Sequence, residues 1–253
     1  HQALHGCAQP GAGGSGFPAG LVTPRLDAGD LELAALYAQA LERAAHLYEA
    51  VPAGVIAHGV LQLPHAPRDV ARFEKIAAQA LWPQGAMQVI NAGAASAWLG
   101  DAVDTGGLMM RDARVIRPLA AVETWLTGVE RVTATVARLE RREGSWRLLD
   151  GDDHVIVEAG QVVLAAGWGS AALLPGGPSL TPVRGQADWV QDESRAPLAW
   201  GGYLAPTADG LLFGATHDRG DTDTASRDAD SARNLQTLAD AINAALDAGA
   251  VTP

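Results

Sequence analysis

VERVTATVARLERREGSWRLLDGDDHVIVEAGQVVLAAG, residues 129–167, is the stretch that decides the fold. Along it apolar residues recur at every second position, which is the period of a strand. Turn-forming residues at Glu143-Gly144, 150–153 and Ala159-Gly160 divide it into three or four strands. Its last apolar run, residues 162–166, is expected to be a strand buried on both faces.

On either side of this stretch helical and strand periods interleave. Residues 27–49 form an amphipathic pattern with Asp30 as its cap, and 55–63 a short strand closed by Pro64. The remaining expectations are a helix over 67–80, a turn and loop over 106–118, a helix over 119–128, a loop over 173–182, a strand over 183–191, a hairpin over 201–220 joined by Asp209-Gly210, and a last helix over 231–249. The first twenty residues carry no strand-like or helix-like period. The fold class is therefore α/β, or α+β-like, with a mixed sheet.

Composition sets the bounds of the function. The 253 residues are 48% hydrophobic and 19% charged, as expected of one large or two small globular domains. No apolar run is long enough to span a bilayer, which predicts a soluble, cytoplasmic protein without a membrane partner. A net charge of -11 excludes a free-standing nucleic-acid binder. The single cysteine, Cys7, cannot form an internal disulfide, so we expect a reducing compartment.

Three local motifs have simpler interpretations than a functional site. Gly11, Gly13 and Gly16 match G-x-G-x-x-G, but without a preceding buried strand or a following helix a flexible loop is the better interpretation. His217 lies in a polar run and is a weak candidate site residue. The neighbouring acidic residues lack the alternation of a calcium loop, which favours a solvated loop and no metal: Asp218, Asp221, Asp223, Asp228 and Asp230. Hydrolase and kinase motifs are also missing from the sequence.

Four segments are unusual together: GGSGFPAGLVTPRLD (13–27), VVLAAG (162–167), PVRGQ (182–186) and GGYLAPTADGLLFGATHDRG (201–220). Their order resembles the D-amino-acid oxidase and glycine oxidase class of FAD-dependent oxidoreductases. Within it they are most similar to the FAD-dependent half of bacterial bifunctional enzymes that modify the wobble uridine of tRNA. The resemblance covers nearly the whole chain.

The resemblance implies the central part of an FAD/NAD(P)-binding-type fold with a mixed-sheet substrate domain. The opening G-x-G-x-x-G strand and the closing flavin segment of the class would lie before His1 and after Pro253, so we expect a piece of a longer chain. Residues 1–30 and 129–180 would form a partial FAD-binding domain, 31–128 and 181–230 the substrate domain, and 231–253 a helix returning toward the FAD domain.

The resemblance also implies site residues around FAD. Catalytic roles fall to Tyr203, which would reach the substrate carboxylate, and to Arg184 on the substrate side of the flavin. The cofactor-binding set is Ser15, Gly16, Ala19, Gly20 and Leu21 near the ring, Val136 beside the adenine, Ala165, Ala166 and Gly167 at the ADP part, and Gly185 and Gln186 beside Arg184.

The implied reaction removes the carboxymethyl group of carboxymethylaminomethyl-uridine in tRNA, giving aminomethyluridine and glyoxylate. Because this chain is acidic, we expect a fused methyltransferase domain to hold most of the tRNA. Two alternatives stay open: an oxidase of small amines such as glycine or sarcosine, and a silent fragment or binding module without a cofactor.

Overall fold

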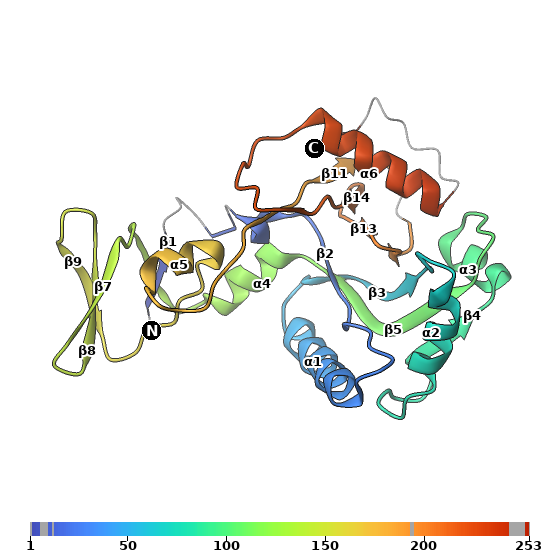
Figure 1. Ribbon diagram of the computed structural model, residues 1–253, viewed down its shortest axis with the longest axis horizontal. Coiled ribbons are helices and arrows are strands. Elements are labelled where there is room, and N and C mark those ends of the chain that lie inside the picture. The colour runs from blue at the N-terminus through green and yellow to red at the C-terminus, as the bar shows by residue number, and fades with distance from the viewer. Residues whose placement is uncertain (1, 6–9, 12, 193–194, 243–250, 253) are drawn as a thin grey trace.

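The computed structural model describes residues 2–5, 10–11, 13–192, 195–242 and 251–252, and Figure 1 shows their arrangement. A nine-stranded mixed sheet forms its centre, in the order β16-β11-β14-β13-β12-β3-β5-β2 with β4 also pairing with β5. Its strands are β2 (Gly20–Val22), β3 (Val55–Gln62), β4 (Met87–Ile90), β5 (Gly107–Ile116), β11 (Ala187–Val190), β12 (Leu198–Ala199), β13 (Tyr203–Pro206), β14 (Leu211–Gly214) and β16 (Val251–Thr252). The β12–β3 pair is parallel and the others are antiparallel, which confirms the mixed sheet.

Three smaller sheets complete the strands. β1 (Gln2–His5) pairs in parallel with β6 (Glu130–Thr133), and β10 (Val183–Arg184) pairs with β15 (Asp218–Arg219). The third sheet is β7 (Arg138–Arg142), β8 (Ser145–Leu149) and β9 (Val155–Ala159), seen at the left of Figure 1. Four strands therefore lie within 129–167, as the period of two predicts.

The helices are α1 (Leu31–Glu49), α2 (Arg68–Ala77), α3 (Ala92–Leu99), α4 (Pro118–Trp125), α5 (Ser170–Leu173) and α6 (Asp228–Ala241), with single 3-10 turns η1 (Gly14–Gly16) and η2 (Gly167–Gly169). α1 begins as predicted, because the Asp30 carboxylate accepts a hydrogen bond from the Leu33 amide at 3.0 Å. None of the helices in the described part of the chain is long and apolar enough to cross a membrane.

Alternate residues of the central strands face two separate cores. Leu204 of β13 and Phe213 of β14 pack with Leu238 of α6, and we call this side of the sheet the α6 face. On the other side Ala205 and Leu212 form a smaller cluster against which Tyr203 packs, and we call it the Tyr203 face. In Figure 1, α6 lies on one side of β11, β13 and β14.

The structure corrects four expectations. Residues 106–118, expected as loop, contain the longest strand, β5, because the exposed pair Arg111-Asp112 interrupts two buried runs and masks their period. Residues 162–166, expected as a buried strand, pair with no strand among the described residues, and Val163 is 89% exposed. Val136 lies between β6 and β7 rather than within a strand.

The fourth correction concerns the N-terminus, where β1 forms despite the lack of a visible period. α6, the described part of the helix expected to return toward the FAD domain, packs on β11 and β14 of the central sheet, and its relation to that domain stays a prediction. The part of that helix over 243–249 lies outside the described residues, as does Cys7. The domain division itself stays a prediction.

Candidate functional site

Tyr203 begins strand β13 and carries the phenol group on its face of the sheet. It lies in register with Ala199 on one side and Gly214 on the other, and its ring is half-buried. Burial raises the pKa of the phenol, and the nearby Asp188 carboxylate raises it further. The phenol therefore stays protonated at neutral pH and can donate a hydrogen bond.

Part of the predicted flavin loop reaches this same face. Ala19 is buried in the cluster against which Tyr203 packs, and Leu21 packs on its edge. Gly20 and Leu21 open strand β2, which pairs with Ile116 and Val115 of β5. The structure thus brings Ala19 and Leu21 to the Tyr203 face.

Ser15 and Gly16 precede that buried stretch and are both exposed in the turn η1. A Cβ at Gly16 would lie 2.0 Å from the Gly11 carbonyl oxygen, so this turn requires glycine. η1 leads into a strand rather than an α-helix, which agrees with the interpretation of the glycine motif as a loop.

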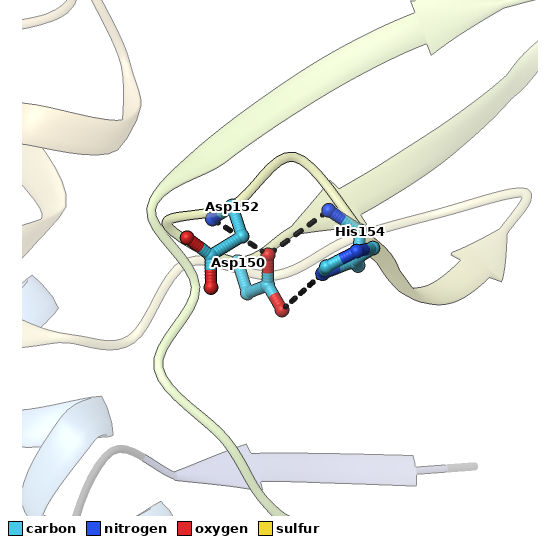
Figure 2. Close-up of side chains that lie close together, drawn as sticks. All are labelled: Asp150, Asp152 and His154. Atoms are coloured by element: carbon cyan, nitrogen blue, oxygen red, sulfur yellow. Dashed lines mark hydrogen bonds and ion pairs between the residues drawn. The ribbon is translucent and has the colours of Figure 1, made fainter.

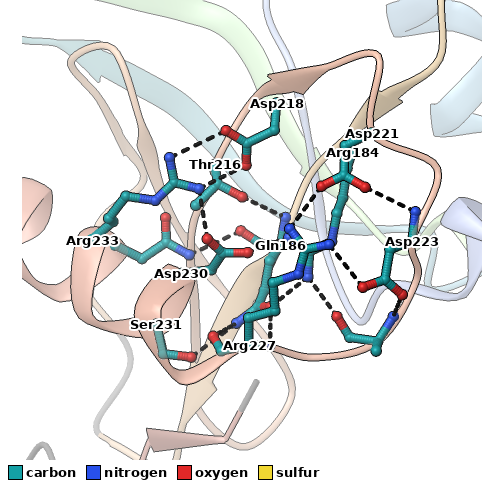
Figure 3. A network of polar contacts seen from close by, with 12 residues as sticks. Arg184, Gln186, Thr216, Asp218, Asp221, Asp223, Arg227, Asp230, Ser231 and Arg233 are labelled. Carbon is teal, nitrogen blue, oxygen red and sulfur yellow. Dashed lines mark hydrogen bonds and ion pairs between the residues drawn. The ribbon is translucent and has the colours of Figure 1, made fainter.

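Arg184 ends strand β10, and its guanidinium is engaged inside the protein (Figure 3). Nη1 donates to the Asp230 carboxylate, and Nη2 donates to Gln186 Oε1 at 2.9 Å and to the Ala225 carbonyl at 2.6 Å. The side chains of Arg184 and Asp230 are only 6% and 5% exposed. This is a buried ion pair with further hydrogen bonds on the cation.

Gln186 is the centre of the same network. Its side-chain oxygen accepts from the Arg227 amide at 2.9 Å, and its amide nitrogen donates to the Arg227 carbonyl at 3.0 Å and to Ser231 Oγ at 2.9 Å. Its backbone N–H donates to Thr216 Oγ1, and its carbonyl accepts from Asn234 Nδ2 at 2.9 Å. Three segments of the chain are therefore joined at one residue.

Gly185 lies between these two polar residues, where a Cβ would approach the Thr216 carbonyl oxygen to 3.2 Å. Both of its neighbours turn their side chains to α6, whose Leu238 belongs to the α6 face. Tyr203 packs on the opposite face. The structure therefore does not bring Arg184 and Gln186 to Tyr203, although the resemblance places all three around one ring.

Four of the five carboxylates considered for calcium bind arginines. Asp221 and Asp223 each accept from Arg227 at 2.7 Å, and Asp218 and Asp230 each accept from Arg233 at 2.6 Å. The arginine partner is the largest cause of the lowered pKa of Asp218, Asp221 and Asp230. For Asp223 the Ala225 amide comes first and Arg227 second. His217 is exposed beside them.

Sequence reasoning missed a buried carboxylate, Asp188 of β11, which is 0% exposed. Its two oxygens accept from Ser231 Oγ at 2.5 Å and from Asn234 Nδ2 at 2.6 Å, both on α6. The signal was one acidic residue within the apolar strand ADWV, opposite a helix with two polar residues three apart. A buried charge of this kind requires such donors.

The predicted ADP-side residues lie at the surface. Ala165, Ala166 and Gly167 are all exposed, and the open space around Gly167 would accommodate a Cβ without contact. Val136 is half-buried between its two strands. Their cofactor role stays a prediction.

One group in the described residues has the ligand atoms for a metal: Asp150, Asp152 and His154 in the β8–β9 turn (Figure 2). Asp150 Oδ1 already accepts from the Asp152 and His154 amides, each at 2.9 Å. These contacts lower the pKa of Asp150, the His154 amide most of all. The group is a side-chain-capped turn.

Solved structures define the class of this fold. It resembles iminodiacetate oxidase from Chelativorans sp. BNC1 with a TM-score of 0.68, 20% identity, and coverage of 88% of this chain and 68% of that one. It also resembles the reduced L-α-glycerophosphate oxidase from Mycoplasma pneumoniae with FAD bound, with a TM-score of 0.73, 12% identity, and coverage of 92% and 70%. The chain therefore shares the fold of these two structures.

The family follows from the sequence. Residues 5–251 match the DAO family of FAD-dependent oxidoreductases, and the chain belongs to that family. It is 49% identical over 231 residues to the tRNA 5-methylaminomethyl-2-thiouridine biosynthesis bifunctional protein MnmC of Caulobacter sp. (strain K31). The match covers 90% of this chain, which spans 38% of the length of that relative.

The residues present fit the cofactor of this family at two surfaces. Gly13 and Gly14 in the η1 segment and Gly167 at the start of η2 are exposed, and a Cβ built on any of them would meet no other atom within 4 Å. Bare backbone of this kind permits close approach of a flat ring or a phosphate. These two segments are therefore open to a cofactor, and their contact with FAD stays a prediction.

Proposed function

We propose that the chain is part of an FAD-dependent oxidase that removes the carboxymethyl group from carboxymethylaminomethyl-uridine at the wobble position of tRNA. The observation that carries this proposal is the 49% identity to a tRNA-modifying bifunctional protein over 90% of the chain. The family adds the cofactor class.

The Tyr203 face is the substrate side in this proposal. The phenol donates a hydrogen bond to the substrate carboxylate, and the apolar cluster that includes Ala19 excludes water from the methylene group beside it. Exposed backbone at Ser15, Gly16 and residues 165–167 holds the cofactor, with Val136 near its adenine. When bound, FAD supplies the two-electron acceptor for the hydride that leaves this methylene carbon.

The proposed reaction balances in atoms and electrons with FAD as its oxidant, and none of its steps requires a metal. Loss of hydride from the carbon between nitrogen and carboxylate, with loss of the N–H proton, forms a C=N bond in the substrate. Water adds to that bond, and the C–N bond then breaks to give the primary amine on the uridine and glyoxylate. The residues of this chain orient the amine and carboxylate for that step.

In this proposal most of the tRNA is bound outside this chain. The chain carries a net charge of -11, and the arginines around α6 are paired with aspartates. An acidic surface repels the phosphate backbone, so a fused methyltransferase domain is the proposed source of most phosphate contacts.

The test compares substrates on the full-length, flavin-loaded protein. Glyoxylate released from tRNA bearing carboxymethylaminomethyl-uridine supports the proposal. Glyoxylate released from glycine, sarcosine or iminodiacetate but not from tRNA supports the small-amine oxidase instead. A full-length protein that retains no flavin contradicts both and favours a silent chain.

A further inference from the structure

The role of Arg184 is set by its surroundings, which differ from those of a substrate contact. Its two terminal nitrogens donate to three acceptors of the protein, Asp230, Gln186 and Ala225. Its Nε is buried and has no partner among the described residues. A guanidinium enclosed in this way offers no accessible donor to a carboxylate.

We propose that Arg184 is a positioning residue that fixes α6 and residues 214–227 behind the strands that carry Tyr203. The proposal rests on the function proposed above, because it assumes that Tyr203 is at the substrate side. It replaces the catalytic role that the resemblance implies for Arg184.

The first step of the coupling runs through α6. Asp230 lies in the first turn of that helix and binds both Arg184 and Arg233, so the helix start is tied to the end of β10. Ser231, the next residue, and Asn234, one turn further along, bind Gln186 and the buried Asp188 carboxylate. Arg184 therefore determines where the donors to Asp188 are held.

The second step runs through the sheet. Ala187, next to Gln186, is in register with Gly214, and Gly214 is in register with Tyr203. A Cβ at Gly214 would lie 3.1 Å from the Ala187 Cα and 3.3 Å from Asn234 Nδ2. With so little space, a shift of α6 moves β14 and the strand beside it.

The phenol of Tyr203 reports this coupling directly. Burial and the Asp188 charge hold its pKa above the ordinary value. Loss of the Arg184 contacts lets β11 and β14 move, and this movement admits water to the half-buried phenol beside β14. The titration of Tyr203 in the folded chain should then move toward that of free tyrosine.

The experiment follows phenolate absorbance in the full chain. The chain has three tyrosines, so replacing Tyr37 and Tyr48 with Phe leaves the signal of Tyr203 alone. Arg184→Met is compared with Arg219→Ala, an exposed arginine on the neighbouring strand β15. We expect a downward shift of the titration midpoint in the first variant and an unchanged midpoint in the second.

Two further variants keep the test decisive. If Arg184→Met does not fold, Asp230→Asn removes the same ion pair from the α6 side while keeping the side-chain shape, and it should shift the midpoint in the same direction. Arg184→Lys keeps the charge but not the fork of donors, and should give a smaller shift.

An unchanged Tyr203 midpoint in a folded Arg184→Met or Asp230→Asn chain overturns the proposal. The titration needs neither FAD nor an amine, so its result is independent of whether tRNA is oxidised. Conversely, an enzyme that proves to act on free amines leaves the positioning role intact if the midpoint shifts.

Discussion

Replacement of Asn234 by Leu should destabilise the chain strongly, because it removes two buried donors without changing the size of the side chain. Asn234 is 4% exposed and its amide donates to the Gln186 carbonyl at 2.9 Å and to Asp188 at 2.6 Å. The Gln186 carbonyl keeps its bond from the Thr216 amide, so losing the bond from Asn234 costs about 1 kcal/mol. Among the described residues the Asp188 carboxylate keeps only its bond from Ser231, and losing a donor to a buried charge costs about 1.5–3 kcal/mol.

The expected loss in free energy of unfolding is therefore about 2.5–4 kcal/mol. Urea denaturation followed by circular dichroism measures it, with an unchanged m-value showing that the denatured state is the same. Gln236→Leu is the matched control, because Gln236 is exposed on the same helix and its amide binds only Asp240 in the described part of the chain. A loss in Asn234→Leu no larger than in the control would refute a buried polar seam between α6 and β11.

Three further predictions follow from the same structure. Asp188→Asn removes a negative charge near Tyr203, so the phenol pKa should fall toward its ordinary value, measured as phenolate absorbance; a rise or no change would contradict the charge effect. The four aspartates paired with arginines beside α6 have pKa values below the usual one, so they stabilise the folded chain above about pH 4 and this contribution is lost as the pH falls further. Thermal melts follow this loss on acidification. If the Arg227→Gln and Arg233→Gln chains lose as much stability on acidification as the unchanged chain, these pairs are not its source. Gly59 has φ of +78° and a Cβ there would lie 2.9 Å from the Trp98 ring, so Gly59→Ala should cost about 1–3 kcal/mol, whereas Gly151→Ala, which meets no atom, should cost little in the same denaturation assay.

The sequence predicts elements well where one period runs unbroken. α1 and its Asp30 cap, the strand β3 and the Asp209-Gly210 hairpin between β13 and β14 all follow from local pattern. The loop prediction over β5 was wrong because its exposed pair Arg111-Asp112 lies in a bulge of the pairing with β3: Gly59 alone separates His58 from Val60, while three residues separate their partners Arg114 and Met110. Neither the bulge nor the buried arginine is visible in a period of two.

Site residues were harder to predict than elements, because their positions depend on distant pairing. PVRGQ identifies Arg184 and Gln186, but which face they occupy is decided by α6, more than forty residues further along the chain. The apolar run over 162–166 has the composition of a central strand, yet a central strand requires neighbouring strands, and it pairs with none among the described residues.

Flavin reduction under anaerobic conditions tests the central claim most directly. The full-length, FAD-loaded protein is mixed with tRNA bearing carboxymethylaminomethyl-uridine, and the visible flavin band and glyoxylate are followed together. The account predicts bleaching of the band with one glyoxylate released for each flavin reduced. A flavin that is bleached by glycine, sarcosine or iminodiacetate and stays oxidised with this tRNA would contradict it.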